Sequence, residues 1–241
     1  MSPAISTQHA PAQVGMSHGK QFTLFSHVLA PNGWKIAFVL NILQRTYEPV
    51  YLDSGTYKSP EHVIYNPNGR IPTLIDHSNG DLVLWESGAI LLYLVDTYDT
   101  EHKISVACPR EKAVLIQWLF FQTTGQGPYF GQSTWFRHFH PEKIPSAIAR
   151  YQNEARRVLG VLESVLSQQE YLVAGKVTIA DIAFVPYNNI LQHVIEDDFD
   201  FKKEFPNTYT WHCKVAAVDG VRSGLEEHLR LITKEETKNA S

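Results

Sequence analysis

The sequence predicts an α+β protein in which a small α/β domain precedes an all-helical domain. Over roughly the first 100 residues, short strand-like runs alternate with helix-like ones, whereas from about residue 111 the pattern is helical throughout. These observations define a flexible tail (1–20), an α/β domain (21–99), a linker (100–110) that contains Pro109, and a helical domain (111–241).

The first part of the α/β domain has a strand–helix–strand pattern. Residues 21–27 and 47–52 are typical of strands, and an amphipathic helix is expected between them, at about 33–44. Pro31-Asn32-Gly33 supplies the turn into this helix, and Asn32 stands where an N-cap belongs. The unit implies parallel strands.

The second part of this domain predicts a hairpin between two helices. A short helix is expected at 59–65, with Pro60 near its start, and it ends at the turn sequence Asn-Pro-Asn-Gly of residues 66–69. Residues 71–76 and 82–85 predict the hairpin, after which Glu86-Ser87 opens an apolar helix. The element order predicts a four-stranded mixed sheet with helices on both faces.

The helical domain is expected to contain five helices, at residues 111–139, 145–167, 178–192, 205–218 and 221–231. Thr178-Ile-Ala-Asp181 resembles a capping box, so Asp181 is expected to accept hydrogen bonds from the backbone and not to take part in chemistry.

Composition excludes several classes of function. A hydrophobic fraction of 44%, a net charge of −4 and a pI near 6.2 indicate a globular protein without general affinity for nucleic acid. Cys108 and Cys213 are too few for a disulfide framework or a zinc site, and we expect both to be bystanders in a reducing compartment. No apolar run reaches the ~20 residues of a membrane helix. The tail lacks a secretory signal, and Met16 is an alternative start. A cytoplasmic protein without membrane partners or metals is expected.

Ile71-Pro72 stands at the entrance of a predicted strand, where a proline removes a ladder donor. A cis bond would turn the preceding backbone outward, so that Ile71 could pair with an extended, peptide-like ligand. The alternative is an ordinary trans proline at the start of an edge strand, and the dipeptide by itself favours that alternative.

Glu86 and Ser87 open a helix, where free N–H groups and the helix dipole attract a carboxylate. The Ser87 hydroxyl adds a donor, and the Glu86 carboxylate can receive an ammonium group. Together they match the α-amino acid end of a ligand, such as the γ-glutamyl end of glutathione. Plain N-capping is the alternative.

Asn32 stands at the start of the first helix, where a thiol held by the protein would be partly ionised by the helix dipole. Its amide N–H can donate to that thiolate, although asparagine cannot itself be a nucleophile, acid or base. The alternative is that Asn32 only caps the helix. Ser26 is a weaker candidate for activating the thiol through a hydroxyl.

In combination these features resemble the glutathione transferase superfamily. The resemblance covers roughly residues 21–218 and is carried by Pro31-Asn32-Gly33, the run from Asn66 to Pro72, the run from Trp85 to Leu94, and the capping box. The segments 118–122, 125–128, 131–132 and 136–140 are most similar to the branch that contains the yeast nitrogen-catabolite regulator, related fungal enzymes and the bacterial nu class.

The resemblance implies a thioredoxin-like first domain that binds glutathione as a substrate. Asn32 would contact the thiol, Ile71 the cysteinyl backbone before a cis proline, and Glu86 with Ser87 the γ-glutamyl group. The remaining glutathione-binding residues implied are Arg70, Pro72 and Arg150. Residues 54–58 depart from the family pattern, in which relatives often have a longer loop with a histidine, so Tyr57 or Lys58 would contact the glycyl carboxylate instead.

Aromatic residues cluster early in the helical domain. Such stripes usually form core, but here some members are expected in a second-substrate pocket or a dimer interface: Phe121, Tyr129, Trp135 and Phe136, with Phe25 and Trp34 as weaker candidates.

The leading hypothesis is therefore a homodimeric glutathione transferase that conjugates small electrophiles or reduces disulfides and peroxides. The second substrate would be a small hydrophobic or disulfide compound. The alternatives are a regulatory protein of nitrogen metabolism that sequesters a transcription factor, and a carrier of small ligands.

Overall fold

The structure, a computed structural model, describes residues 18–53 and 55–239 of the chain. The chain divides into two compact units, one formed by Met1–Leu94 with Ser223–Ser241 and the other by Val95–Arg222. Met16 and most of the expected tail lie outside the described residues. In the part of the chain that is described, no helix is long and apolar enough to cross a bilayer.

The first unit is built on a four-stranded sheet of β1 (Phe22–Ser26), β2 (Tyr47–Tyr51), β3 (Thr73–Asp76) and β4 (Leu82–Trp85). The strand order is β2-β1-β3-β4, with β1 parallel to β2 and the other pairs antiparallel. This confirms the predicted mixed sheet. All five residues of β1 are buried, as expected for an inner strand covered on both faces.

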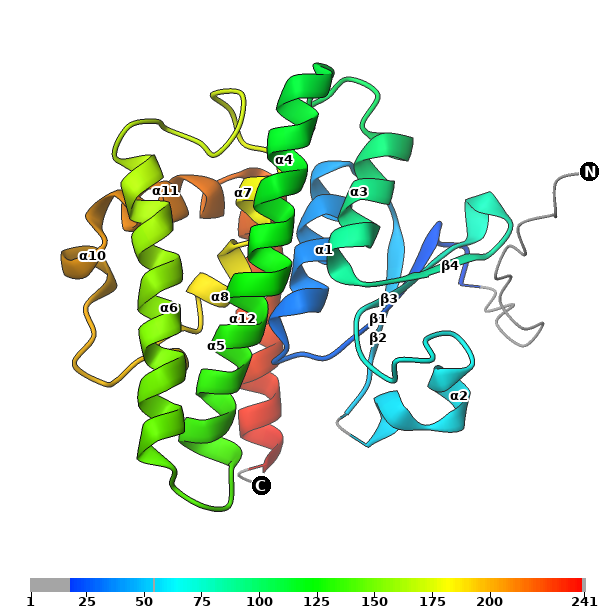
Figure 1. The fold of residues 1–241 in the computed structure, drawn as a ribbon. Coiled ribbons are helices and arrows are strands. Elements are labelled where there is room, and N and C mark those ends of the chain that lie inside the picture. The colour runs from blue at the N-terminus through cyan, green and yellow to red at the C-terminus, as the bar shows by residue number, and fades with distance from the viewer. Residues whose placement is uncertain (1–17, 54, 240–241) are drawn as a thin grey trace, which may run out of the picture. The chain divides into compact units, whose positions relative to one another are not determined.

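Three helices connect the strands of this sheet or follow them directly. Figure 1 shows α1 (Pro31–Ile42) and α3 (Ser87–Tyr98) together on one side of the strands and the short α2 (Pro60–Val63) on the other. Single 3₁₀ turns, η1 (Thr56–Lys58) and η2 (His77–Asn79), complete the connections.

The prediction that Asn32 caps α1 was wrong. The N-cap is Ala30, Pro31 occupies the first turn of the helix, and Asn32 is already helical. Proline suits this position because its fixed φ is helical and its missing N–H has no acceptor to lose. The amide of Asn32 is therefore not used to cap the helix.

The C-terminal part of α12 (Asp219–Asn239) belongs to the first unit and packs on α1. An ideal Cβ on Gly224 would lie 2.4 Å from the Phe38 ring, which shows how closely the two helices approach. The rings of Trp34 and His228 stack with centroids 4.4 Å apart. The helix runs well beyond the predicted segment 221–231.

In the second unit, the expected long helix at 111–139 starts earlier, at Pro109, and contains two π-helical turns. Its parts are α4 (Pro109–Phe121), η3 (Gln122–Gln126), α5 (Gly127–Thr134) and η4 (Trp135–Phe139). Pro128 is the second residue of α5, one residue beyond η3, and the wider π turn accommodates a residue that cannot donate its N–H. α6 (Pro145–Leu166) follows as predicted.

The single helix predicted at 178–192 is instead three short ones. They are α7 (Ile179–Ile182), α8 (Val185–Asn188) and α9 (Leu191–Val194). Pro186 explains the first break, because its ring would clash with the carbonyl four residues earlier, that of Ile182. The capping box of Thr178 and Asp181 is confirmed. α10 (Phe201–Glu204) was not predicted, and α11 (Pro206–Ala216) lies close to its predicted range.

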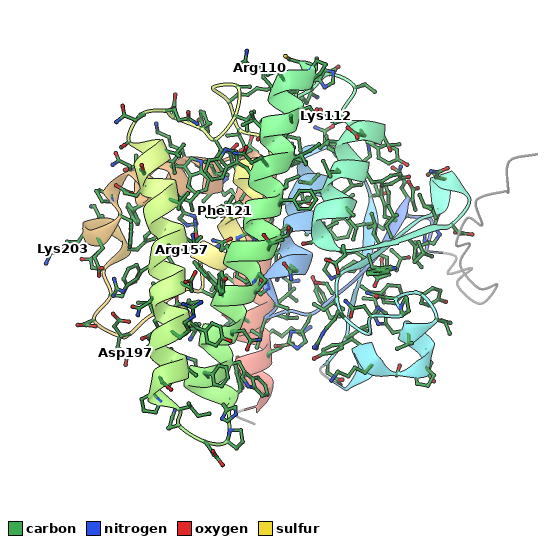
Figure 2. All side chains as sticks on the ribbon, in the orientation of Figure 1. Arg110, Lys112, Phe121, Arg157, Asp197 and Lys203 are labelled. Atoms are coloured by element: carbon green, nitrogen blue, oxygen red, sulfur yellow. The ribbon has the colours of Figure 1, made fainter. Side chains whose placement is uncertain are left out.

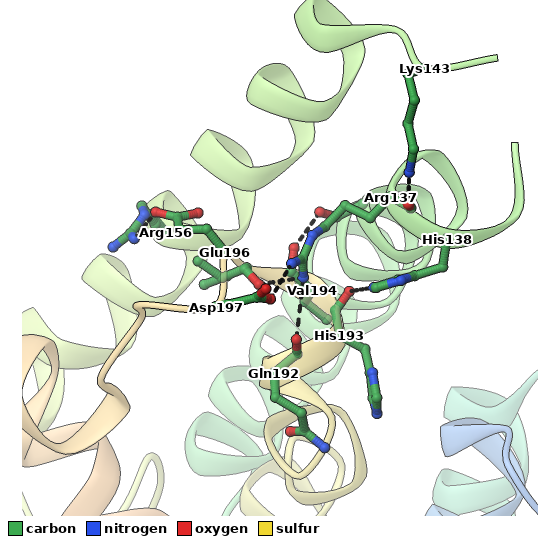
Figure 3. A network of polar contacts seen from close by, with 11 residues as sticks. Arg137, His138, Lys143, Arg156, Gln192, His193, Val194, Glu196 and Asp197 are labelled. Atoms are coloured by element: carbon green, nitrogen blue, oxygen red, sulfur yellow. Dashed lines mark hydrogen bonds and ion pairs between the residues drawn. The ribbon is translucent and has the colours of Figure 1, made fainter.

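A polar network ties η4 to α9 and the residues that follow it (Figure 3). The guanidinium of Arg137 donates to the carbonyls of Gln192 and Ile195 and pairs with Asp197 at 3.0 Å. Arg156 of α6 pairs with Glu196 in the same segment. Figure 2 shows Asp197 and Lys203 at the periphery of the helical unit, with their side chains directed outward. We interpret the network as structural, since its donors and acceptors satisfy one another.

Candidate functional site

Three chain segments meet at one end of the sheet. β1 leads into α1 at this end, and β3 begins here because Phe25 pairs with Thr73. β4 also ends here, because Thr73 pairs with Trp85 on the other side. The residues that follow β1, precede β3 and follow β4 are therefore neighbours in space.

A cavity of about 180 Å³ opens among these segments. Its lining is mostly polar and includes six residues that the sequence predicts for the glutathione site, together with two that it does not. The lining residues are Asn32, Asn66, Asn68, Arg70, Ile71, Pro72, Glu86 and Ser87.

A buried hydrogen-bond chain holds the loop before β3. Asn66, which is 1% exposed, donates from Nδ2 to the carbonyl of Arg70 at 2.7 Å and to Oγ1 of Thr73 at 3.1 Å. His62 contacts Thr73 Oγ1 with Nε2 at 3.0 Å and the Tyr57 carbonyl with Nδ1 at 2.8 Å. A carbonyl only accepts, so His62 donates to Tyr57 from Nδ1. These hydrogen bonds fix the backbone of Arg70 and of the residues beside it.

Two backbone features mark the site. The Ile71-Pro72 bond is cis, so the trans alternative does not apply. Glu86 has a φ of 69°, a left-handed conformation that costs a non-glycine residue about 1 kcal/mol or more. Such conformations are concentrated at functional sites, where the surrounding structure enforces them. Glu86 is the residue that connects β4 to α3, and in this conformation it is exposed beside the cavity.

Lys35 lies behind Ser87 and is the main residue of the site that the sequence reasoning missed. It is 1% exposed, and its Nζ donates to Ser87 Oγ at 3.3 Å. Burial lowers the pKa of Lys35 to about 7, and the nearby negative charge of Glu86 opposes this shift. The available signal was a charged residue inside an otherwise apolar stretch of α1, Gly33–Leu40.

The arrangement fits a ligand that carries both a carboxylate and an ammonium group. Donors are the amides of Asn32 and Asn68, the Arg70 guanidinium, the Ser87 hydroxyl and the first N–H groups of α3. Glu86 provides the negative charge. Carboxylates bind favourably at a helix N-terminus, so the carboxylate of such a ligand fits at Ser87. Its ammonium group fits beside the negative charge of Glu86.

The other residues predicted for glutathione lie outside the lining of this cavity. Tyr57 and Lys58 form η1, and the Tyr57 carbonyl accepts the His62 hydrogen bond described above. Arg150 belongs to the helical unit, where it is largely exposed and pairs with Glu154 at 3.5 Å. Contacts of these residues with a ligand remain predictions.

The predicted aromatic residues all belong to the helical unit but differ in environment. Phe121 packs on Trp118 and Phe184 with centroids 5.7 and 6.3 Å away, and Tyr129 packs against the core. By contrast, Trp135 is 48% exposed and stacks on the exposed Phe139. Phe136 stacks on Tyr151 and His140. Trp135 is thus the member with most surface available for a ligand or partner.

Ser26 and the two cysteines lie outside the cavity. Ser26 is 2% exposed and lies against Gly33, and it does not line the cavity. Cys108 and Cys213 are exposed free thiols in the helical unit. Across residues 18–53 and 55–239, no group of three or more metal-binding side chains occurs.

Comparison with protein families gives two matches. The glutathione S-transferase N-terminal domain matches residues 20–96, and the glutathione S-transferase C-terminal domain matches residues 128–219. Glutathione S-transferase 1 of Schizosaccharomyces pombe is 48% identical over 227 residues, covering 88% of this chain and 98% of that protein. The transcriptional regulator URE2 of Saccharomyces cerevisiae is 40% identical, covering 79% of this chain and 63% of that protein.

Solved structures agree with this assignment. Glutathione transferase URE2P8 from Phanerochaete chrysosporium, solved with oxidised glutathione, is 52% identical, with a TM-score of 0.87 over 90% of this chain and 99% of that one. Ure2p5 from the same fungus, cocrystallised with 1-(S-glutathionyl)-2,4-dinitrobenzene, is 48% identical, with a TM-score of 0.83 over 90% and 98%. The chain therefore belongs to the glutathione S-transferase family, with a thioredoxin-like first domain and a helical second domain.

Proposed function

We propose that this protein binds glutathione in the cavity at the end of the sheet and activates its thiol for attack on a second substrate. The observation that carries the proposal is the convergence of Asn32, Ile71 and the Glu86-Ser87 pair on one small polar cavity. The α-amino acid end of glutathione would occupy the Glu86-Ser87 side. The relatives solved with oxidised glutathione and with a glutathione conjugate support this ligand.

The thiol would lie beside Asn32, near the N-terminus of α1. The helix dipole favours the thiolate over the thiol, and the Asn32 amide can donate to the sulfur. Neither group needs to gain or lose a proton itself. The activated thiolate can displace a leaving group from an electrophilic carbon and form a thioether.

Reduction of disulfides is the second reaction that we propose. The glutathione thiolate would attack one sulfur of a small disulfide and form a mixed disulfide while the other sulfur leaves as a thiolate. A second glutathione would then attack the mixed disulfide, releasing oxidised glutathione and the second thiol. None of the lining residues of the cavity is a cysteine, so no protein thiol competes with glutathione there. Attack on a peroxide oxygen would follow the same principle.

The test is a comparison of wild-type protein and Asn32→Ala in assays of conjugation and of disulfide reduction. Loss of a hydrogen bond to a charged sulfur, worth about 1.5–3 kcal/mol, should lower kcat/KM about 10- to 100-fold in both assays. Asn79→Ala, at the opposite end of the β3–β4 hairpin, is the matched control and should retain wild-type rates. Wild-type rates in Asn32→Ala would remove Asn32 from the mechanism, and inactivity of the wild type in every assay would overturn the enzymatic proposal.

A regulatory role is the second candidate, because URE2 of Saccharomyces cerevisiae is 40% identical over 227 residues. Expression of this chain in a yeast strain that lacks URE2 separates the two roles. Restored nitrogen regulation by Asn32→Ala, which is expected to be catalytically impaired, would favour the regulatory role. Failure of both the wild type and the variant to restore it would favour the enzyme.

We also propose a cytoplasmic homodimer. Light scattering on the purified protein should give twice the chain mass of 27.4 kDa, and a mass equal to one chain would contradict the dimer.

A further inference from the structure

A buried lysine beside a proposed anion site is unexpected on physical grounds. Removing an ammonium group from water is costly, and the N-terminus of a helix repels a cation. Lys35 is nevertheless 1% exposed, and it lies beside Ser87, the first residue of the twelve-residue helix α3. A bound carboxylate at this helix end would offset both costs.

The direction of one hydrogen bond explains how Lys35 can act on the ligand. An ammonium group has only donors, so in the Lys35–Ser87 contact of 3.3 Å the serine oxygen is the acceptor. The only proton of the Ser87 hydroxyl is then available to another acceptor, and Ser87 lines the cavity. A neutral amine could instead accept that proton and turn it away from the cavity.

We propose that Lys35 is a positioning residue for glutathione. Its buried ammonium donates to Ser87, directs the serine hydroxyl toward the ligand, and supplies positive charge for the α-carboxylate of the γ-glutamyl residue. The inference rests on the proposed function and adds to it a coupling between glutathione binding and the charge of a residue that the ligand need not touch.

Surrounding groups support the coupling. The negative charge of Glu86 acts on Lys35 and favours the ammonium form. The titratable groups that β2 and α12 bring toward Trp34 of α1 include Tyr47, Tyr51 and His228. Glu227 and Arg230 of α12 act on Tyr51 from the same side. Because the pKa of Lys35 is about 7 in the free protein, binding of a carboxylate should raise it and draw in a proton above that pH.

The test uses S-methylglutathione, which has no thiol to titrate. Isothermal titration calorimetry at pH 8, in buffers of different ionisation enthalpy, counts the protons taken up on binding. At one pH unit above the pKa, about a tenth of the free protein carries the proton, so the wild type should take up a large fraction of one proton. Lys35→Met should bind S-methylglutathione at least about tenfold more weakly than the wild type. It should also take up fewer protons on binding. Lys20→Met, an exposed lysine in the same unit, should match the wild type.

Further outcomes separate this inference from the proposed function. Lys35→Arg keeps its charge at every pH used, so its affinity should not fall between pH 7 and 8.5 as that of the wild type should. If Lys35→Met and Lys35→Arg fail to fold, the number of protons that the wild type takes up on binding still tests the role of Lys35. Tight binding without proton uptake by the wild type would overturn the role of Lys35 and leave glutathione binding intact. No binding of S-methylglutathione would overturn both.

Discussion

At the scale of single residues, the sequence predicted the members of the site better than their local roles. Short motifs predict Asn32, Ile71, Glu86 and Ser87 as site residues, and all four line one cavity. The capping role given to Asn32 failed because α1 starts at Pro31, which places the N-cap two positions earlier, at Ala30. Lys35 was missed because its importance comes from burial beside Ser87, which no local pattern encodes.

Gly33 gives a sharp test at this scale. An ideal Cβ there would lie 1.8 Å from Ser26 Oγ and 2.8 Å from its Cβ, so any larger side chain must displace β1 or α1. We expect Gly33→Ala to lower the free energy of unfolding by about 1–3 kcal/mol, measured by chemical denaturation. Gly160→Ala is the matched control. Its Cβ meets nothing within 4 Å, and it should raise stability by about 0.5–1 kcal/mol. Equal effects of the two changes would show that the close approach does not constrain the site.

At the scale of elements, prolines account for most differences between prediction and structure. The periodicity of apolar residues predicts where helices lie, but not where they are interrupted. Pro186 divides the helix expected at 178–192, and Pro128 follows the π turn η3 within a helical run that otherwise continues. The short α10 was missed because four residues carry too little periodicity.

The start of α7 depends on one buried side chain, that of Asp181. Asp181 is buried and accepts hydrogen bonds from Thr178 N and Oγ1, Leu172 N and Trp211 Nε1, at 2.9–3.0 Å. Asp181→Ala leaves these donors without an acceptor and should cost about 3 kcal/mol or more in unfolding experiments. Asp200→Ala removes an exposed cap of α10 and should cost only about 1 kcal/mol. A loss at Asp181 no larger than that at Asp200 would contradict the buried network.

At the scale of the whole molecule, the order of elements was sufficient to predict the fold class. The strand–helix–strand unit, the hairpin and the following helices all derive from local patterns, and chain order then limits the possible sheets. The packing of Gly224 and His228 of α12 on α1 was not predictable in this way. It depends on a contact between Gly224 and Phe38, nearly two hundred residues apart, and amphipathicity does not identify a partner.

The pH dependence of global stability should report a second buried titratable group, His212. Burial lowers the pKa of His212 to about 4, whereas an unfolded histidine titrates near 6.5. Between these values the unfolded state binds more protons, so stability falls as the pH falls. From pH 7 to pH 5 we expect His212 to account for about 2 kcal/mol of lost stability. His212→Phe should flatten this decline in urea denaturation, and equal slopes for the two proteins would show that His212 is not protonated on unfolding.

The most direct test of the central claim is the pKa of the glutathione thiol in the complex. Ultraviolet absorbance of the thiolate, titrated with pH for bound glutathione, reports it without a second substrate. We expect a value at least one unit below the ~8.5 of a free thiol in the wild type, and a value closer to the free thiol in Asn32→Ala. An unshifted pKa in the wild-type complex, or the same shift in both proteins, would contradict activation of glutathione at Asn32.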